Sequence, residues 1–371
     1  MQKIKASGGG RCNVTNAITD VTELIKKYPR GGNFLRKSLF NFNTSDTIKW
    51  FQERSVNLKT EADGRVFPVS DDSQTIIDCI WKEMILNKVS VFYHKSLIKI
   101  NKTNNVFELV FNDNTIQYAD VVLLTCGGFP KQEQYKWLID CGHTIQNPVP
   151  SLFTFNIPNN TITQLMGVSL PDVTVKITGT KFVQTGPILI THWGVSGPVV
   201  LKLSAFAARE LNNKNYEFDI SINWLNDITE TDLKNQFFEI RKIDGKSFLC
   251  SKNPFGLPKR LWEFLLHKAC IKEETRWGEL PAKEQNRLII NLLQDTYSVK
   301  GKTTFKEEFV TAGGINLKEI DANNMQSKIV SGLFFGGEIM DVDGITGGFN
   351  FQHAWSSAYI AAKGIIEYLQ L

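Results

Sequence analysis

Apolar and polar residues alternate along this chain with two different spacings, which together predict a mixed α/β protein. Apolar residues recur every three or four positions, the spacing of one helix face, at residues 20–28, 33–42, 45–54, 76–85, 229–243, 259–270, 281–296 and 351–369. Short β-branched and aromatic runs, typical of strands, lie at residues 89–93, 96–101, 106–111, 121–125, 173–178, 188–191, 216–222 and 303–311. Ser45 is the expected N-cap of the third helix.

The order of these elements predicts one domain in two separate segments, with an insertion between them. Residues 1–150 and 329–371 form the first domain, and the sequence Asn-Pro-Val-Pro at 147–150 predicts a linker at its edge. Residues 151–224 and 299–328 predict a β-barrel-like or sandwich insert. Residues 225–298 predict a helical insert, with Pro281 in the first turn of its last helix. The C-terminal helix is therefore expected to pack back on the first domain.

The most informative segment lies near the C-terminus, where an apolar strand leads to an acid and two pairs of glycines. The strand is predicted at Leu333–Phe335, and Gly336 and Gly337 allow a ligand to approach the backbone because they carry no Cβ. Glu338 follows the strand end, where open α/β sheets bind ligands, and its carboxylate can accept hydrogen bonds from sugar hydroxyls. The glycine pair at 347–348 precedes a helix whose free N–H groups favour negative charge. We interpret this segment as a cofactor site; a glycine-rich β-hairpin with a packing helix is the structural alternative.

Two further glycine clusters carry candidate ligand-binding groups. The sequence Ser-Gly-Gly-Gly-Arg-Cys-Asn-Val-Thr-Asn at residues 7–16 brings backbone N–H groups close to the charge of Arg11, which suits a phosphate or a carbonyl-rich ring. The run 121–125 is apolar enough for a strand of a buried parallel sheet, and it ends at Cys126, Gly127 and Gly128. An ordinary core strand with a glycine turn is the alternative for this third segment.

Together these segments resemble a flavoprotein family whose members are described as aminoacetone-oxidase-like or 3-dehydro-bile-acid-reductase-like NAD(P)/FAD-dependent oxidoreductases. The resemblance rests on residues 7–16, 124–128, 191–198 (Thr-His-Trp-Gly-Val-Ser-Gly-Pro), 311–315 (Thr-Ala-Gly-Gly-Ile) and 332–362. Their order and rough spacing match throughout, so the resemblance covers essentially the whole chain. It implies an α/β fold with a discontinuous, Rossmann-like FAD-binding domain and an inserted β-barrel plus helical domain.

The resemblance also implies FAD as cofactor, a small-molecule substrate and NAD(P)H as a candidate reductant that binds transiently near the flavin. The residues that it places at the cofactor are Gly9, Gly10, Arg11, Asn13, Gly127, Gly337, Glu338, Thr346, Gly347, Gly348, Phe349 and Asn350. The first four would line the flavin or the pyrophosphate. Glu338 would hold the ribityl chain, and residues 346–350 would meet the pyrimidine edge of the ring.

One part of the family pattern has no counterpart in these 371 residues. The family carries a strand, a Gly-x-Gly-x-x-Gly turn, a helix and a second strand ahead of the segment that begins here at Ser7. Six residues precede Ser7, whereas a βαβ unit needs about 30 or more. We therefore expect an N-terminally truncated FAD-binding domain that retains FAD weakly or not at all. A start upstream of Met1 is the favoured explanation, and a naturally truncated chain is the alternative.

Composition excludes some classes of protein and leaves others open. The chain is 42% hydrophobic and 22% charged, has a net charge of +4, and contains no apolar run of transmembrane length and no signal peptide at Met1. A cytoplasmic protein without a membrane partner is expected. Six scattered cysteines without a Cys-x-x-Cys pair predict free thiols and no metal site. The small net charge does not indicate a nucleic-acid surface, and the oligomeric state is not predicted.

His192 is the candidate acid–base residue, because it is expected at a strand end before the glycine turn at Gly194. A histidine that caps a structural turn is the alternative. The substrate is expected between the flavin and the insert, near His192 and residues 311–315. Cys12 lies beside Arg11 and glycine N–H groups, and packing near the flavin is the favoured interpretation for it. A non-catalytic protein that binds RNA or a protein partner, and an inactive fragment, are the alternative functions.

Overall fold

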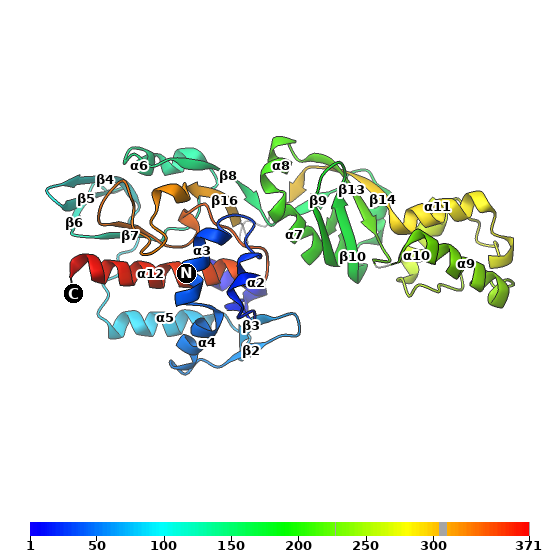
Figure 1. The fold of residues 1–371 in the computed structure, drawn as a ribbon, viewed down its shortest axis with the longest axis horizontal. Coiled ribbons are helices and arrows are strands. Elements are labelled where there is room, and N and C mark those ends of the chain that lie inside the picture. Colours follow the sequence, from blue (N-terminus) through cyan, green and yellow to red (C-terminus); the bar gives the residue numbers. More distant parts are fainter. Residues whose placement is uncertain (227, 304–309, 371) are drawn as a thin grey trace. The chain divides into compact units, whose positions relative to one another are not determined.

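The computed structural model describes residues 1–226, 228–303 and 310–370, and the chain divides into two compact units (Figure 1). Unit 1 comprises residues 1–151 and 305–371, and unit 2 comprises residues 152–304. The first domain is therefore discontinuous. The return point differs from the prediction, which placed residues 299–328 in the insert. Strand β16 (Val310–Ile315) belongs to unit 1 because it pairs with β8 (Ile145–Ser151) of that unit.

Unit 1 contains helices of very different length and several small sheets. Its helices are α1 (Gln2–Ala6), α2 (Val21–Ile25), α3 (Gly32–Asn41), α4 (Thr44–Gln52), α5 (Gln74–Leu86), α6 (Lys136–Ile139) and α12 (Phe349–Leu369). Its strands are β1 (Thr15–Asn16), β2 (Leu58–Thr60), β3 (Arg65–Pro68), β4 (Leu97–Thr103), β5 (Val106–Phe111), β6 (Ile116–Ala119), β7 (Val122–Leu124), β8, β16 and β17 (Leu333–Phe335). Short 3-10 turns lie at Ser7–Gly10, Gln132–Tyr135, Leu317–Glu319 and Gly337–Ile339.

The parallel pair β17 and β7 positions the candidate site. Leu333 lies opposite Val122 and Phe335 opposite Leu124, so both strands run in the same direction. All three residues of β17 are fully buried, as expected for a parallel sheet. The prediction of a parallel strand at 121–125 is confirmed for residues 122–124, of which Leu123 is half-buried rather than fully buried. Because the carboxyl ends of parallel strands meet at one edge, the segments that follow β7 and β17 lie side by side.

Helix α12 ties the N-terminal segment to the C-terminal segment of unit 1. Its buried residues recur every three to four positions, and the prediction of a helix at 351–369 is confirmed. Several of its buried side chains are polar, and the side-chain oxygen of one of them, Gln352, accepts hydrogen bonds from the hydroxyls of Thr15 (2.5 Å) and Thr47 (2.9 Å). Trp355 donates to the backbone oxygen of Val14 at 3.0 Å. These bonds fix the strand β1 region against the helix.

Three local predictions for unit 1 differ from the structure. Residues 89–93 form no strand, and Phe92 and Tyr93 are 63% and 65% exposed; within the described residues no strand pairs with this segment. The expected linker at 147–150 lies inside β8, whose prolines are tolerated because β16 is the one strand that pairs with β8 among the described residues. Helix α4 is capped by Asn43 rather than Ser45, because the Asn43 side chain accepts from the N–H groups of the first turn.

Unit 2 combines an antiparallel sheet with a helical part. Its strands are β9 (Thr154–Asn156), β10 (Ser169–Ile177), β11 (Val183–Thr191), β12 (Gly194–Ser196), β13 (Glu217–Asn223), β14 (Asp295–Lys300) and β15 (Lys302–Thr303). Its helices are α7 (Pro198–Phe206), α8 (Ala208–Asn213), α9 (Glu230–Asp244), α10 (Lys259–Lys268) and α11 (Ala282–Leu293). The hydrogen-bonded order is β14-β13-β10-β11-β12-β9-β15, with every recorded pair antiparallel. In the part of the chain that is described, this order has two ends, and no bond joins β14 to β15. Most of the predicted strand 303–311 lies outside the described residues.

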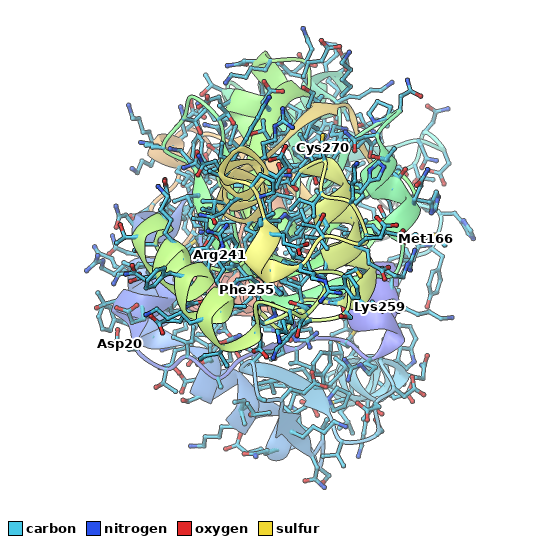
Figure 2. The ribbon with its side chains drawn as sticks, turned by 90° about the vertical axis from the view of Figure 1, so that its right-hand side faces the viewer. Asp20, Met166, Arg241, Phe255, Lys259 and Cys270 are labelled. Atoms are coloured by element: carbon cyan, nitrogen blue, oxygen red, sulfur yellow. The ribbon has the colours of Figure 1, made fainter. Side chains whose placement is uncertain are left out.

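The helical part of unit 2 confirms the predicted helices and packs around aromatic rings. Figure 2 looks onto it and labels Phe255 in the segment that joins α9 to α10. The ring of Phe255 lies 5.8 Å from the rings of both Phe237 and Trp262, and Trp277 stacks on Trp262. Pro281 precedes α11 as its N-cap rather than standing in its first turn.

Candidate functional site

The ends of β7 and β17 carry a glycine pair and a carboxylate in close contact. A Cβ added at Gly127 would lie 3.9 Å from Oε2 of Glu338. At Gly128 an added Cβ would lie 3.0 Å from Cβ of Thr311 and 3.1 Å from the backbone oxygen of Glu338. Only glycine leaves this space free of side chains. We call Lys3, Gly127, Gly128, Thr311 and Glu338 the strand-end site.

Lys3 is a member of the strand-end site that no sequence pattern indicated. Its ammonium group forms an ion pair with the carboxylate of Glu338, whose side chain is 11% exposed. Lys3 lies in α1, directly before the turn that holds Gly8–Gly10. A lysine within a polar stretch carries no local signal of a partner 335 positions away. The N-terminal segment therefore reaches the predicted cofactor carboxylate.

The triple glycine forms a left-handed turn with one open side. Gly8, Gly9 and Gly10 have φ values of 60°, 68° and 87°. A Cβ at Gly8 would meet the ring of Phe67 at 2.9 Å, whereas a Cβ at Gly9 or Gly10 would meet no described atom within 4 Å. Arg11 is engaged elsewhere, since its guanidinium bonds Glu61 at 2.6 Å. The open side of this turn is thus formed by backbone alone.

Asn13 lies against the second glycine pair. With its amide oriented to satisfy both neighbours, its oxygen accepts from the N–H of Gly348 and its nitrogen donates to the backbone oxygen of Thr15, each at 2.9 Å. Asn16 donates to the backbone oxygen of Gly347 at 3.0 Å. The structure therefore brings residues 13–16 and 347–348 together, as the resemblance implied for two parts of one site. Their contact with a cofactor stays a prediction.

The start of α12 is held by its own side chains. Asn350 accepts from the N–H of Gly344 at 2.8 Å and donates to its oxygen at 2.9 Å. Phe349 is buried with its ring edge-on to Tyr28 at 6.2 Å. Thr346 is half-buried.

Gly337, which follows β17, lies inside unit 1. Its backbone N–H donates to the hydroxyl of Ser357 in α12 at 2.9 Å.

A buried ion pair fixes the loop between the strand-end site and α12. Arg30 forms two hydrogen bonds with the carboxylate of Asp343 through Nε and Nη2, and Ser151 donates to the same carboxylate at 2.9 Å. Burial raises the pKa of Asp343 above its ordinary value, and the Arg30 guanidinium opposes that rise. Sequence reasoning missed this pair because the two residues are 313 positions apart.

Two buried polar side chains near these loops have no hydrogen-bond partner among the described residues. They are Thr311, through its hydroxyl, and His353, through both ring nitrogens. Thr311 is 1% exposed and His353 is fully buried. Such groups are uncommon in native proteins and each calls for an explanation. A ligand that supplies the missing partner is one such explanation.

His353 should make stability depend on pH. Burial lowers its pKa to about 4 from an ordinary 6.5, so between these values the unfolded chain binds a proton that the native chain does not. The free energy of unfolding should therefore fall by about 3 kcal/mol as the pH drops from about 6.5 to about 4. Urea unfolding across this range would measure it. The variant His353→Leu should lose most of that slope, and an unchanged slope would contradict the assignment.

His192 lies in unit 2, in the turn between β11 and β12. It is exposed, and its ring is edge-on to Trp193 with 4.3 Å between ring centres. The strand-end site belongs to unit 1. The catalytic role of His192 therefore remains a prediction.

No group of three His, Cys, Asp or Glu side chains is placed to hold a metal ion within the part described. Among the helices described, none combines the length and apolar character needed to cross a membrane.

Comparison with known proteins places nearly the whole chain in one family. The family described as "HI0933-like protein Rossmann domain" matches residues 1–364. The chain is 30% identical over 377 residues to the ribosomal RNA dihydrouridine synthase of Escherichia coli (strain K12), covering 98% of this chain and 89% of that protein. It is 26% identical over 376 residues to the 3-dehydro-bile acid delta(4,6)-reductase of Clostridium scindens, covering 99% and 90%. A ribosomal RNA dihydrouridine synthase of Haemophilus influenzae is 26% identical over 381 residues, covering 98% and 89%. The family resemblance is confirmed, and the chain belongs to the HI0933-like family of Rossmann-domain proteins.

Proposed function

We propose that this protein is an FAD-dependent oxidoreductase that reduces a carbon–carbon double bond conjugated to a carbonyl group. The observation that carries the proposal is the strand-end site, where a carboxylate and two glycines lie at the ends of parallel strands. Open α/β sheets bind cofactors at this position. The family match to a Rossmann domain supports the same reading.

The residues present fit a flavin and its ribityl chain. At Gly127 an added Cβ would meet only the Glu338 carboxylate, at 3.9 Å, so a ligand held by that carboxylate would find no side chain in its way there. Glu338 would accept hydrogen bonds from ribityl hydroxyls, and the open side of Gly9 and Gly10 would lie along the same ligand. When bound, the reduced flavin supplies a hydride equivalent. The protein's own contribution is to hold and orient the reactants and to exclude water.

The class of reaction is inferred from the names of two relatives, which imply similar chemistry. Dihydrouridine differs from uridine by two hydrogens across a double bond conjugated to a carbonyl. A delta(4,6)-reductase that acts on a 3-dehydro bile acid removes double bonds conjugated to the 3-oxo group. Both are additions of a hydride and a proton, with NAD(P)H as the candidate source of the electrons. His192 is the candidate that would deliver the proton.

The substrate class is a choice between a free enone and a uridine in RNA. The net charge of +4 gave no indication of nucleic acid, but two relatives that match almost the whole chain are named for ribosomal RNA. A small-molecule substrate, as expected from the sequence, is equally supported by the bile acid relative. RNA uridine therefore joins the small-molecule enone as a proposed substrate.

The test begins with flavin binding and ends with reduction. The purified chain is titrated with FAD, and FAD is then kept in excess during NADH or NADPH oxidation with a 4-en-3-one steroid or with ribosomal RNA that lacks dihydrouridine. Substrate-dependent oxidation with either acceptor supports the proposal. Loss of FAD during purification would agree with the expected weak retention, whereas absence of binding with FAD in large excess would overturn the proposal. A tightly bound yellow complex would instead contradict our expectation of weak retention.

Glu338→Gln should weaken FAD binding about tenfold to a hundredfold. The change keeps the side-chain size but removes the charge, and a hydrogen bond to a charged group contributes about 1.5–3 kcal/mol. Flavin fluorescence titration would measure the affinity. Glu23→Gln is the matched control, because Glu23 is exposed and pairs only with Lys26 among the ion pairs recorded for it. Equal affinities in the two variants would remove Glu338 from the site.

A further inference from the structure

We propose that Lys3 competes with the flavin for the carboxylate of Glu338, so that cofactor binding has to break the ion pair between these two side chains. This inference rests on the proposed function and concerns the regulation of the same site. It gives a role to a bond that joins α1 to the segment after β17. In the empty site, Lys3 stands where a ligand hydroxyl would stand.

The ammonium group of Lys3 is bonded to the carboxylate oxygen on the Gly127 side of the site. That oxygen is Oε2 of Glu338, the same atom that an added Cβ at Gly127 would approach to 3.9 Å. The Glu338 side chain is only 11% exposed, so the part of it that a ligand can reach is small. A ribityl hydroxyl held over Gly127 would therefore have to take the place of the ammonium group.

Lys3 can leave Glu338 while α1 stays in place. Ile4, the next residue of α1, is 7% exposed and packs in a core cluster with side chains of α5. The hydroxyl of Ser73 donates to the backbone oxygen of Lys5 at 3.3 Å. The side chain of Lys3 itself is 51% exposed, and a lysine ammonium on its flexible stem is readily hydrated. The ion pair can therefore open by rotation of one side chain.

The exposure of Lys3 also limits the size of the effect. An ion pair with one half-exposed partner is screened by water and salt and contributes little free energy. Breaking it should weaken flavin binding by about twofold to fivefold. The competition would thus add to the weak FAD retention expected from the sequence.

Lys3→Met should tighten flavin binding about twofold to fivefold relative to Lys5→Met, because it frees the carboxylate. Lys5 is the matched control, since it is exposed, lies in the same helix and loses the same charge. Both FAD and riboflavin are titrated by fluorescence. Riboflavin carries the ring and the ribityl chain without phosphates, so it reports on the hydroxyl contacts alone. In the Glu338→Gln background, Lys3→Met should no longer tighten binding.

Two measurements test the ion pair independently of these affinities. Lys3→Met should lower the thermal midpoint of the flavin-free protein relative to Lys5→Met, because only Lys3 is recorded as the ion-pair partner of Glu338 among the described residues. Added salt should tighten riboflavin binding by the wild type toward the affinity of Lys3→Met, and it should leave Lys3→Met nearly unchanged.

The sign of the change in affinity decides the inference. Equal riboflavin affinities of Lys3→Met and Lys5→Met would overturn it. Weaker FAD binding by Lys3→Met than by Lys5→Met, with equal riboflavin binding, would also overturn it, because Lys3 would then contact the phosphates. Absence of binding by every variant and by the wild type, with FAD in large excess, would instead overturn the proposed function and this inference with it.

Discussion

Replacing Asp343 with alanine is expected to lower the free energy of unfolding by about 3–5 kcal/mol. The side chain of Asp343 is fully buried, and that of Arg30 is 12% exposed. The alanine removes the carboxylate from beside a guanidinium that has little access to water, and it also leaves the hydroxyl of Ser151 without its acceptor. Urea unfolding, with the slope against urea compared between variants, would measure the loss.

The controls separate the loss of a buried charge pair from the loss of any ion pair. Lys136 and Asp140 form an exposed pair, with side chains 76% and 55% exposed. Asp140→Ala should change the free energy of unfolding by less than about 1 kcal/mol. A double change of Arg30 to Met and Asp343 to Leu should recover much of the loss, because it removes both charges together. Equal effects of the two alanine variants would mean that the Arg30–Asp343 pair contributes no more than a surface pair.

Loss of the Arg30–Asp343 ion pair should also affect the candidate site. Asp343 lies in the loop between Glu338 and the start of α12, and Arg30 forms a β-bridge with it. A loop fixed at this point keeps Glu338 and residues 346–350 in one arrangement. We therefore expect Asp343→Ala to weaken flavin binding as well as stability.

Local patterns predicted those elements of the fold whose stability is itself local. Helix α12 and the helices of unit 2 have apolar residues at helical spacing, and the strands of the parallel pair are short and wholly apolar. Segment 89–93 has an equally good strand pattern but forms no strand. A strand exists only where another strand supplies its hydrogen bonds, so a local pattern cannot decide it. For the same reason the local pattern did not predict β8. This strand contains two prolines, which are compatible with it because β16 is the one strand that pairs with β8 among the described residues.

The prediction of the candidate site was incomplete, and the reason differs from that for the strands. A glycine run shows where the backbone is unusual, but it does not show which side of that backbone is open. Gly9 faces open space in the structure, whereas a Cβ at Gly348 would lie 2.3 Å from the backbone oxygen of Thr15. Arg11 likewise carries a positive charge that would suit a phosphate, but its guanidinium donates a hydrogen bond to the carboxylate of Glu61. Lys3 and Asp343 depend on partners more than 300 positions away, and no local pattern contains that information.

Gly348 and Gly9 differ in what an added Cβ would meet. Both have positive φ, 90° at Gly348 and 68° at Gly9, which costs a residue with a Cβ about 1–2 kcal/mol. At Gly348 the Cβ also collides with Thr15, and a forced shift in a packed region costs about 1–3 kcal/mol more. Gly348→Ala should therefore lower the free energy of unfolding by about 2–5 kcal/mol. Gly9→Ala should lower it by only about 1–2 kcal/mol.

The two variants should rank in the opposite order for ligand binding, once each is compared at a temperature where it is folded. The new methyl group of Gly9→Ala stands on the open side of the glycine turn, where a bound flavin would lie, so its FAD affinity should fall about tenfold. The methyl group of Gly348→Ala points at Thr15, and its effect on affinity should follow only from the shift of that contact. Calorimetric unfolding and flavin titration of both proteins would test this. A Gly9→Ala protein that binds FAD normally would show that the ligand does not lie along the turn, and it would confine the cofactor to the ends of β7 and β17.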